Sequence, residues 1–115
     1  MKISETGQLL RIFIGESDKW EGRPLYEAII LKARERGVAG ATMLRGLMGY
    51  GAASRIHTAK ILRLSEDLPI VVEIVDSAEK IESFLPIIDE MVGEGLVTLE
   101  QVRVIQYRHG RADSD

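Results

Sequence analysis

The sequence contains no cysteine and few aromatic residues. Without cysteine, its 115 residues form no disulfide, no thiolate metal site and no cysteine nucleophile, and the chain suits a reducing, cytoplasmic location. Aromatic residues make up only 5% of the chain, and its net charge is −3. Neither a stacking platform for bases nor a strongly basic surface is expected, so we predict no nucleic-acid partner.

Long apolar runs are also missing. The first seven residues lack the apolar core of a signal peptide, and runs such as residues 28–31 are too short to span a bilayer, so we expect no direct membrane insertion. A composition of 45% hydrophobic and 29% charged residues is typical of a globular chain. We therefore predict a single domain over residues 1–115, small enough for oligomerisation to add to its core.

The first half of the chain predicts a strand, a helix and a second strand. Apolar residues alternate at period two between Gly7 and Glu16, which indicates a strand. Pro24 suits the first turn of a helix, and Gly37 stands where a left-handed C-terminal cap belongs. Residues 39–46 then predict the next strand.

The second half repeats this order. The β-branched run from Pro69 to Val75 predicts a strand, and Asp76 with Glu79 has the spacing of a helix capping box. A strongly periodic helix follows, in which Pro86 should cause a kink, and two shorter helices remain an alternative. Residues 93–95 end the helix, and residues 96–107 form a last extended segment.

Strand, helix, strand occurring twice predicts an α+β, ferredoxin-like βαββαβ fold. Its antiparallel sheet would carry both helices on one face. Because the strands are strongly apolar, the other face would be left sticky, and packing the sheets of several subunits together would cover it.

The segment that joins the two halves, about residues 47–68, is long for a compact domain, and we expect a mobile loop there and a flexible tail at about 109–115. No carboxylate occurs between Glu35 and Glu66, whereas five Lys or Arg residues do. Glycines at 49 and 51 followed by cations have the ingredients of a phosphate-binding loop. The alternatives, ordinary turn glycines and a solvated basic face, remain open.

No catalytic or metal-binding set can be assigned. The two histidines, His57 and His109, lack the spacing of paired ligands, and no serine has a nucleophile-elbow context. Glu73, alone in an apolar strand, is either a perturbed general base or the partner of an arginine. We therefore expect a protein that is not an enzyme and holds no metal.

Three motifs together resemble the nitrogen-regulatory PII signalling proteins, and most closely their uncharacterised PII-like branch. Residues 40–51 are similar to the family's Gly-Met-Thr-Val-Thr-x-x-x-Gly-Phe-Gly. Residues 93–96 resemble its Gly-Asp-Gly-Lys loop, and residues 102–110 resemble its Arg-Val-Ile-Arg-x-Arg-x-Gly ending. The resemblance extends from about Gln8 to Gly110.

The resemblance implies a cytoplasmic regulatory homotrimer that binds ATP, ADP or AMP, with Mg²⁺ as a possible companion, in clefts between subunits. The 47–68 loop would relay the nucleotide state to a target protein, such as a transporter or a metabolic enzyme. By this resemblance Thr42 contacts the base and Arg108 a phosphate. The remaining nucleotide-binding residues would be Gly49, Tyr50, Gly51, Gly93, Glu94 and Gly95, with Arg55, His57 and Lys60 as further phosphate-binding candidates.

Two departures from the family pattern bear on the ligand. Leu96 stands in place of the lysine of the glycine loop, and Gln106 in place of one C-terminal arginine. With two phosphate contacts missing, we expect AMP or ADP to compete well with ATP. The alternative is a trimeric interaction or metal-tolerance protein of the CutA type, which has a similar architecture without nucleotide binding.

Overall fold

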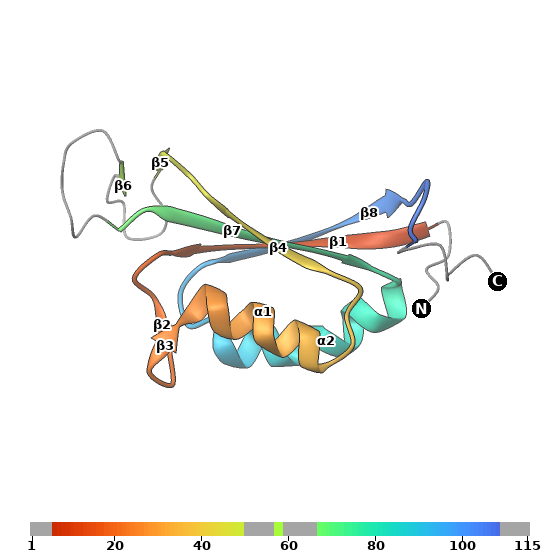
Figure 1. Ribbon diagram of the computed structural model, residues 1–115, viewed down its shortest axis with the longest axis horizontal. Helices are drawn as coiled ribbons and strands as arrows, with labels where there is room; N and C mark the ends of the chain where they lie inside the picture. The colour runs from red at the N-terminus through yellow and green to blue at the C-terminus, as the bar shows by residue number, and fades with distance from the viewer. Residues whose placement is uncertain (1–5, 50–56, 59–66, 109–115) are drawn as a thin grey trace.

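A computed structural model describes residues 6–49, 57–58 and 67–108 (Figure 1). Four strands form the main sheet in the order β4-β7-β1-β8, with every neighbouring pair antiparallel. This is the predicted βαββαβ arrangement. The elements are β1 (Thr6–Gly15), β2 (Lys19–Trp20), β3 (Arg23–Pro24), α1 (Leu25–Glu35), β4 (Ala41–Arg45), β5 (Met48–Gly49), β6 (His57–Thr58), β7 (Pro69–Asp76), α2 (Ala78–Met91) and β8 (Leu96–Arg103).

The core lies between the helices and one face of the sheet, as predicted (Figure 1). The even-numbered residues of β1 and β7 point toward the helices because side chains alternate along a strand. α1 and α2 close this core with stripes spaced three and four residues apart. Its buried apolar residues are Leu10, Ile12, Ile14, Leu25, Ala28, Ile29, Ala33, Ile70, Val72, Ile74, Ile81, Phe84, Ile88 and Met91.

The ends of α1 follow the sequence signals. Pro24, with φ −56°, stands at the N-cap and ends the small β2–β3 hairpin. That hairpin turns through Glu21 and Gly22, both at positive φ, which matches the twist of two adjoining strands. Gly37 has φ +78° and ends the helix in the left-handed conformation that glycine adopts without strain.

The start of α2 differs from the predicted capping box. Ser77, not Asp76, is the N-cap, and its hydroxyl accepts a hydrogen bond from the backbone N–H of Lys80. Asp76 is buried and accepts hydrogen bonds from the backbone N–H groups of Ala39, at 2.8 Å, and Ser77, at 2.6 Å. The carboxylate therefore ties the segment before β4 to the start of α2.

Pro86 does not divide the second helix. α2 runs without interruption from Ala78 to Met91, so the alternative of two shorter helices is wrong. Pro86 lies on the exposed side of the helix, opposite the residues that pack on the sheet, and burial of that apolar face outweighs one missing hydrogen bond.

The last strand is shorter than the predicted extended segment, because β8 ends at Arg103 and residues 104–108 continue outside the sheet. Within the 47–68 segment, β5 pairs with β6 through Met48 opposite Thr58 and Gly49 opposite His57. The predicted tail at 109–115 lies outside the described residues.

Replacing Asp76 by alanine tests its role as a tie. The change leaves two buried N–H groups without their charged acceptor, so we expect the free energy of unfolding to fall by roughly 1.5–3 kcal/mol. Urea denaturation measures this, with Asp89→Ala on the exposed side of α2 as the control, expected within about 0.5 kcal/mol of the unmodified protein. Equal effects of the two changes would contradict the assignment.

Candidate functional site

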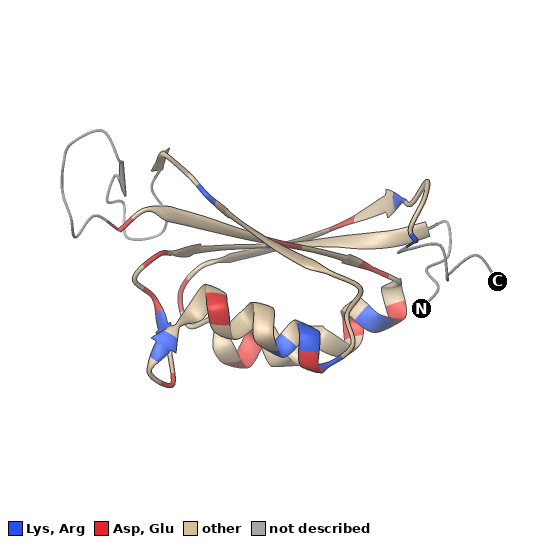
Figure 2. Ribbon diagram, viewed as in Figure 1, with Lys and Arg blue, Asp and Glu red and all other residues tan. Residues whose placement is uncertain are grey.

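The face of the main sheet turned away from α1 and α2 is called the outer face here. Strand register places its side chains in rows, and one row is wholly apolar: Leu44 lies beside Val71, Val71 beside Phe13, and Phe13 beside Leu96. Leu44 is 48% exposed and Leu96 is 56% exposed. Charged residues gather mainly on the helices and at the ends of the sheet, while the strands are mostly uncharged (Figure 2).

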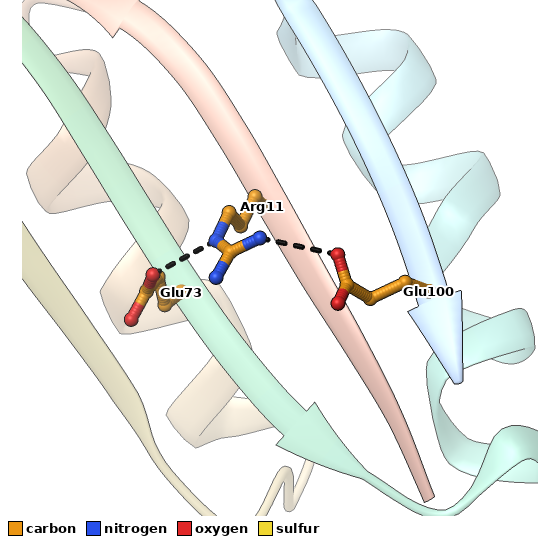
Figure 3. Close-up of polar contacts among 3 residues, drawn as sticks. All are labelled: Arg11, Glu73 and Glu100. Carbon is orange, nitrogen blue, oxygen red and sulfur yellow. Dashed lines mark hydrogen bonds and ion pairs between the residues drawn. The ribbon is translucent and has the colours of Figure 1, made fainter. Parts of the chain in front are cut away.

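The next row of the outer face is polar. It runs Thr42, Glu73, Arg11, Thr98 across the four strands. Arg11 donates from Nε to Glu73 Oε2 at 2.9 Å and from Nη1 to Glu100 Oε1 at 3.2 Å (Figure 3). We call these three residues the ion triad. The hydrogen bond to Glu73, followed by the charge of Glu100, raises the pKa of Arg11 above its ordinary value.

The ion triad bears on the two interpretations of Glu73. Its carboxylate is paired with an arginine, as the second interpretation expected. The sequence alone does not connect Arg11 and Glu100 with it. Each of the three strands carries one charged residue at an outward position, but pairing those charges requires the strand register.

The described site residues fall into two groups, and the first joins the start of β4 to the C-terminal segment, which follows β8 at the right of Figure 1. Thr42 is exposed at the start of β4. The hydroxyl of Tyr107 donates a long hydrogen bond of 3.4 Å to the carbonyl of Ala39, which brings the C-terminal segment to the same end. Arg108 follows directly and is exposed. We call Thr42 and Arg108 the threonine group.

The second set of residues, called the glycine group, lies toward the other end of the sheet. Gly49 packs near the Pro69 ring at the start of β7, and residues 93–95 link α2 to β8 beside the end of β1. A Cβ on Gly95 would lie 2.7 Å from the carbonyl oxygen of Phe13, so close packing alone requires glycine there. Gly93 and Glu94 are exposed.

A single chain does not bring these groups together. The eight residues of β8 separate Gly95 from the C-terminal segment that carries Arg108. At about 3.3 Å per residue, the two ends of β8 lie about 23 Å apart. Within the glycine group, β7 and β1 separate Gly49 from Gly95, which amounts to about 14 Å at the usual strand spacing. The surfaces that carry these residues lie along the two edges of the sheet.

Several predicted site residues cannot be placed. Tyr50, Gly51, Arg55 and Lys60 lie outside the described residues, and His57 is located by the backbone of β6. One cation of the carboxylate-free stretch is already paired: Arg45 Nη2 lies 2.6 Å from Glu16 Oε2 and joins the ends of β4 and β1.

Among residues 6–49, 57–58 and 67–108, no group of three or more histidine or acidic side chains could hold a metal ion. No helix there is both long and apolar enough to cross a membrane.

Comparison with protein families identifies relatives. Residues 7–104 match the family model DUF190, whose description reads "Uncharacterized ACR, COG1993". The chain belongs to this family. A UPF0166 protein of Aquifex aeolicus is 46% identical over 100 residues, which cover 85% of this chain and 92% of that protein. One from Methanocaldococcus jannaschii is 35% identical over 98 residues, covering 84% and 90%.

Solved structures similar to this DUF190 chain share its fold. CPII from Thiomonas intermedia, a nitrogen-regulatory PII-like protein bound to ADP, AMP and bicarbonate, matches with a TM-score of 0.60 at 21% identity, over 88% of this chain and 90% of that one. The divalent ion tolerance protein CutA1 from Ehrlichia chaffeensis matches with a TM-score of 0.58 at 9% identity, over 91% and 87%. The fold is therefore PII-like, as the motifs implied.

Gly93 and Gly95 form a matched pair that tests whether packing requires glycine at position 95. Gly95→Ala should lower the free energy of unfolding by roughly 1–3 kcal/mol because its Cβ meets the backbone of Phe13. Gly93→Ala meets no atom within 4 Å and should be neutral or stabilise by up to about 1 kcal/mol. Thermal or urea unfolding measures both, and equal losses would contradict the described loop geometry.

Proposed function

We propose that this protein is a PII-like regulatory protein, without catalytic activity, that binds an adenine nucleotide between the subunits of a homotrimer. ATP, ADP and AMP are the candidate ligands. The proposal rests on the three motifs of the sequence and on the shared fold with CPII, a protein described as bound to ADP and AMP. The nucleotide would lie where the threonine group of one subunit meets the glycine group of the next.

The observation that carries this proposal is the separation of the two groups. Arg108 follows the far end of β8 from Gly95, and the whole width of the sheet separates Thr42 on β4 from residues 93–95 beside β8, yet their motifs jointly resemble one nucleotide site. A second copy of the chain, with its β8 edge near the β4 edge of the first, would bring Gly93 to Gly95 close to residues that one chain holds far away. A site completed by a neighbour explains why a single chain shows two separate halves.

The relay to a target protein is assigned to the segment between β4 and β7. Its two ends are fastened to the body of the protein, since the N–H of Gly46 donates to the carbonyl of Pro69 at 2.8 Å and the N–H of Glu16 donates to the carbonyl of Leu68 at 2.8 Å. Gly49, at one of these ends, belongs to the glycine group. Nucleotide held there would act directly on the base of the segment that meets the target.

Leu96 bears on which nucleotide is preferred. In the family pattern a lysine at this position supplies a phosphate contact, whereas here an exposed leucine lies in the apolar row of the outer face. Without this cation, the additional phosphate of ATP would gain little binding energy relative to ADP or AMP. We therefore expect ADP and AMP to bind within about tenfold of ATP.

The CutA-type alternative shares the fold, so the architecture does not choose between them. Isothermal titration with ATP, ADP and AMP, with the oligomer mass recorded in the same buffer, does. We expect saturation near one nucleotide per subunit. A trimer that binds none of the three would contradict the proposal and favour the alternative, whereas ATP binding far tighter than ADP and AMP would contradict only the role given to Leu96.

Arg108→Ala tests the phosphate contact. Loss of a charge-assisted hydrogen bond costs roughly 1.5–3 kcal/mol, so the dissociation constant for ADP should rise about 10-fold to 100-fold. Arg34→Ala on the exposed side of α1 is the matched control and should bind ADP as the unmodified protein does. Unchanged affinity in the Arg108 variant would remove this residue from the site.

A further inference from the structure

The segment that follows β8 reaches from one edge of the main sheet toward the other. β8 ends at Arg103, and residues 104–108 continue without regular secondary structure. The hydroxyl of Tyr107 nevertheless donates to the carbonyl of Ala39, which directly precedes the β4 edge. β1 and β7 lie between β8 and β4, a width of about 14 Å at the usual strand spacing. The segment therefore crosses the end of the sheet.

Gly7 leaves room for the start of this crossing. Val104 is half-buried, and a Cβ on Gly7 would lie 3.2 Å from Val104 Cγ2 and 2.9 Å from the carbonyl oxygen of Asp76. Beyond Val104 the segment is more open to water, since Ile105 is 78% exposed and Gln106 is also exposed. Packing thus fastens the near end of the segment, and the tyrosine hydroxyl fastens its far end.

The carbonyl that accepts this hydrogen bond belongs to a firmly held stretch of backbone. The N–H of Ala39 donates to the buried carboxylate of Asp76 at 2.8 Å. The N–H of Val38, one residue earlier, donates to the carbonyl of Ala33 in α1 at 3.0 Å. β4 begins two residues after Ala39, and Thr42 is its second residue. A side chain bound to this carbonyl is therefore held in a fixed relation to Thr42.

We propose that Tyr107 is a positioning residue of the nucleotide site, and that its hydroxyl keeps Arg108 near Thr42 before any nucleotide binds. This inference rests on the proposed function. Gln106 stands where the family pattern has one of its two arginines, so Arg108 is the arginine of that pattern that remains in this chain. An exposed arginine on an unfastened segment loses much conformational freedom when it binds a phosphate, and fastening the adjacent residue lowers that cost.

The size of the effect follows from the geometry. The hydrogen bond is long, at 3.4 Å, and Tyr107 is 38% exposed, so its contribution lies toward the lower end for a neutral hydrogen bond. Tyr107→Phe removes the donor and keeps the ring. We expect this variant to raise the dissociation constant for ADP about threefold to fivefold, less than the loss expected for Arg108→Ala.

A double-mutant cycle, measured by isothermal titration of the full chain with ADP, separates positioning from a merely structural role. If Tyr107 acts through Arg108, adding Tyr107→Phe to Arg108→Ala should change the dissociation constant less than about 1.5-fold, because no arginine is left to position. A structural role would give the same loss in both backgrounds. Tyr26→Phe is the matched control: it removes the same atom from a tyrosine that packs against the core, and it should bind ADP as the unmodified protein does.

Backbone ¹⁵N relaxation of the nucleotide-free protein tests the contact without a ligand. Amides of residues 104–108 should gain fast motion in Tyr107→Phe but not in Tyr26→Phe. Unchanged motion in Tyr107→Phe, or equal losses of ADP affinity with and without Arg108, would overturn the inference. Normal ADP binding by Tyr107→Phe would overturn the positioning role alone, whereas an unmodified protein that binds no ADP would overturn the proposed function and the positioning role together.

Discussion

Two helices cover one face of a four-stranded sheet, and among the described residues nothing covers the other, so half of a strongly apolar sheet remains to be buried. The even-numbered side chains of β1 and β7 enter the core, and their odd-numbered neighbours form the outer face. Because apolar burial is the main favourable term in folding and association, the apolar part of the exposed face also tends to leave water. The exposed apolar side chains of β8 add to the surface that remains to be buried.

The position of the candidate site follows from the same constraint. Threonine and glycine groups lie along the two edges of the sheet, where neighbouring copies would meet if the outer faces pack together. Assembly and ligand binding would then use adjoining surfaces, and a nucleotide bound between copies would strengthen the assembly by mass action. Arg11 and Glu73 of the ion triad lie in the same row as Thr42, whereas Glu100 lies in the next row, beside Leu9.

The sequence was sufficient to predict the fold because each element carries a strong local signal. The alternation of apolar residues in β1 predicts a strand, and the periodic apolar stripe of α2 predicts a helix. Gly37 predicts the left-handed end of α1. Asp76 was misassigned because its partner, Ala39, is 37 residues away, and no local pattern reveals such a hydrogen bond. Two shorter helices were an alternative because Pro86 removes one helical hydrogen bond. Burial of the apolar face of α2 in the core outweighs that local penalty.

The candidate site was predictable only in part. Motifs supplied Thr42, residues 93–95 and Arg108, and their resemblance implied clefts between subunits, but how far apart one chain holds these residues depends on strand order and register. The ion triad was missed because its members are brought together solely by strand register. Gly95 shows a further limit, since a glycine that resembles a ligand-binding residue also has a packing reason of its own.

The most direct measurement is subunit complementation. Arg108→Ala impairs the threonine group, and Gly93→Leu, placed in open space, obstructs the glycine group without a clash in the chain. Each variant alone should bind ADP weakly. After the two are mixed, dissociated and reassembled, about a quarter of the sites in a cyclic assembly should combine two intact halves and regain the original affinity. No recovery, despite demonstrated mixing of subunits, would contradict a nucleotide site shared between copies.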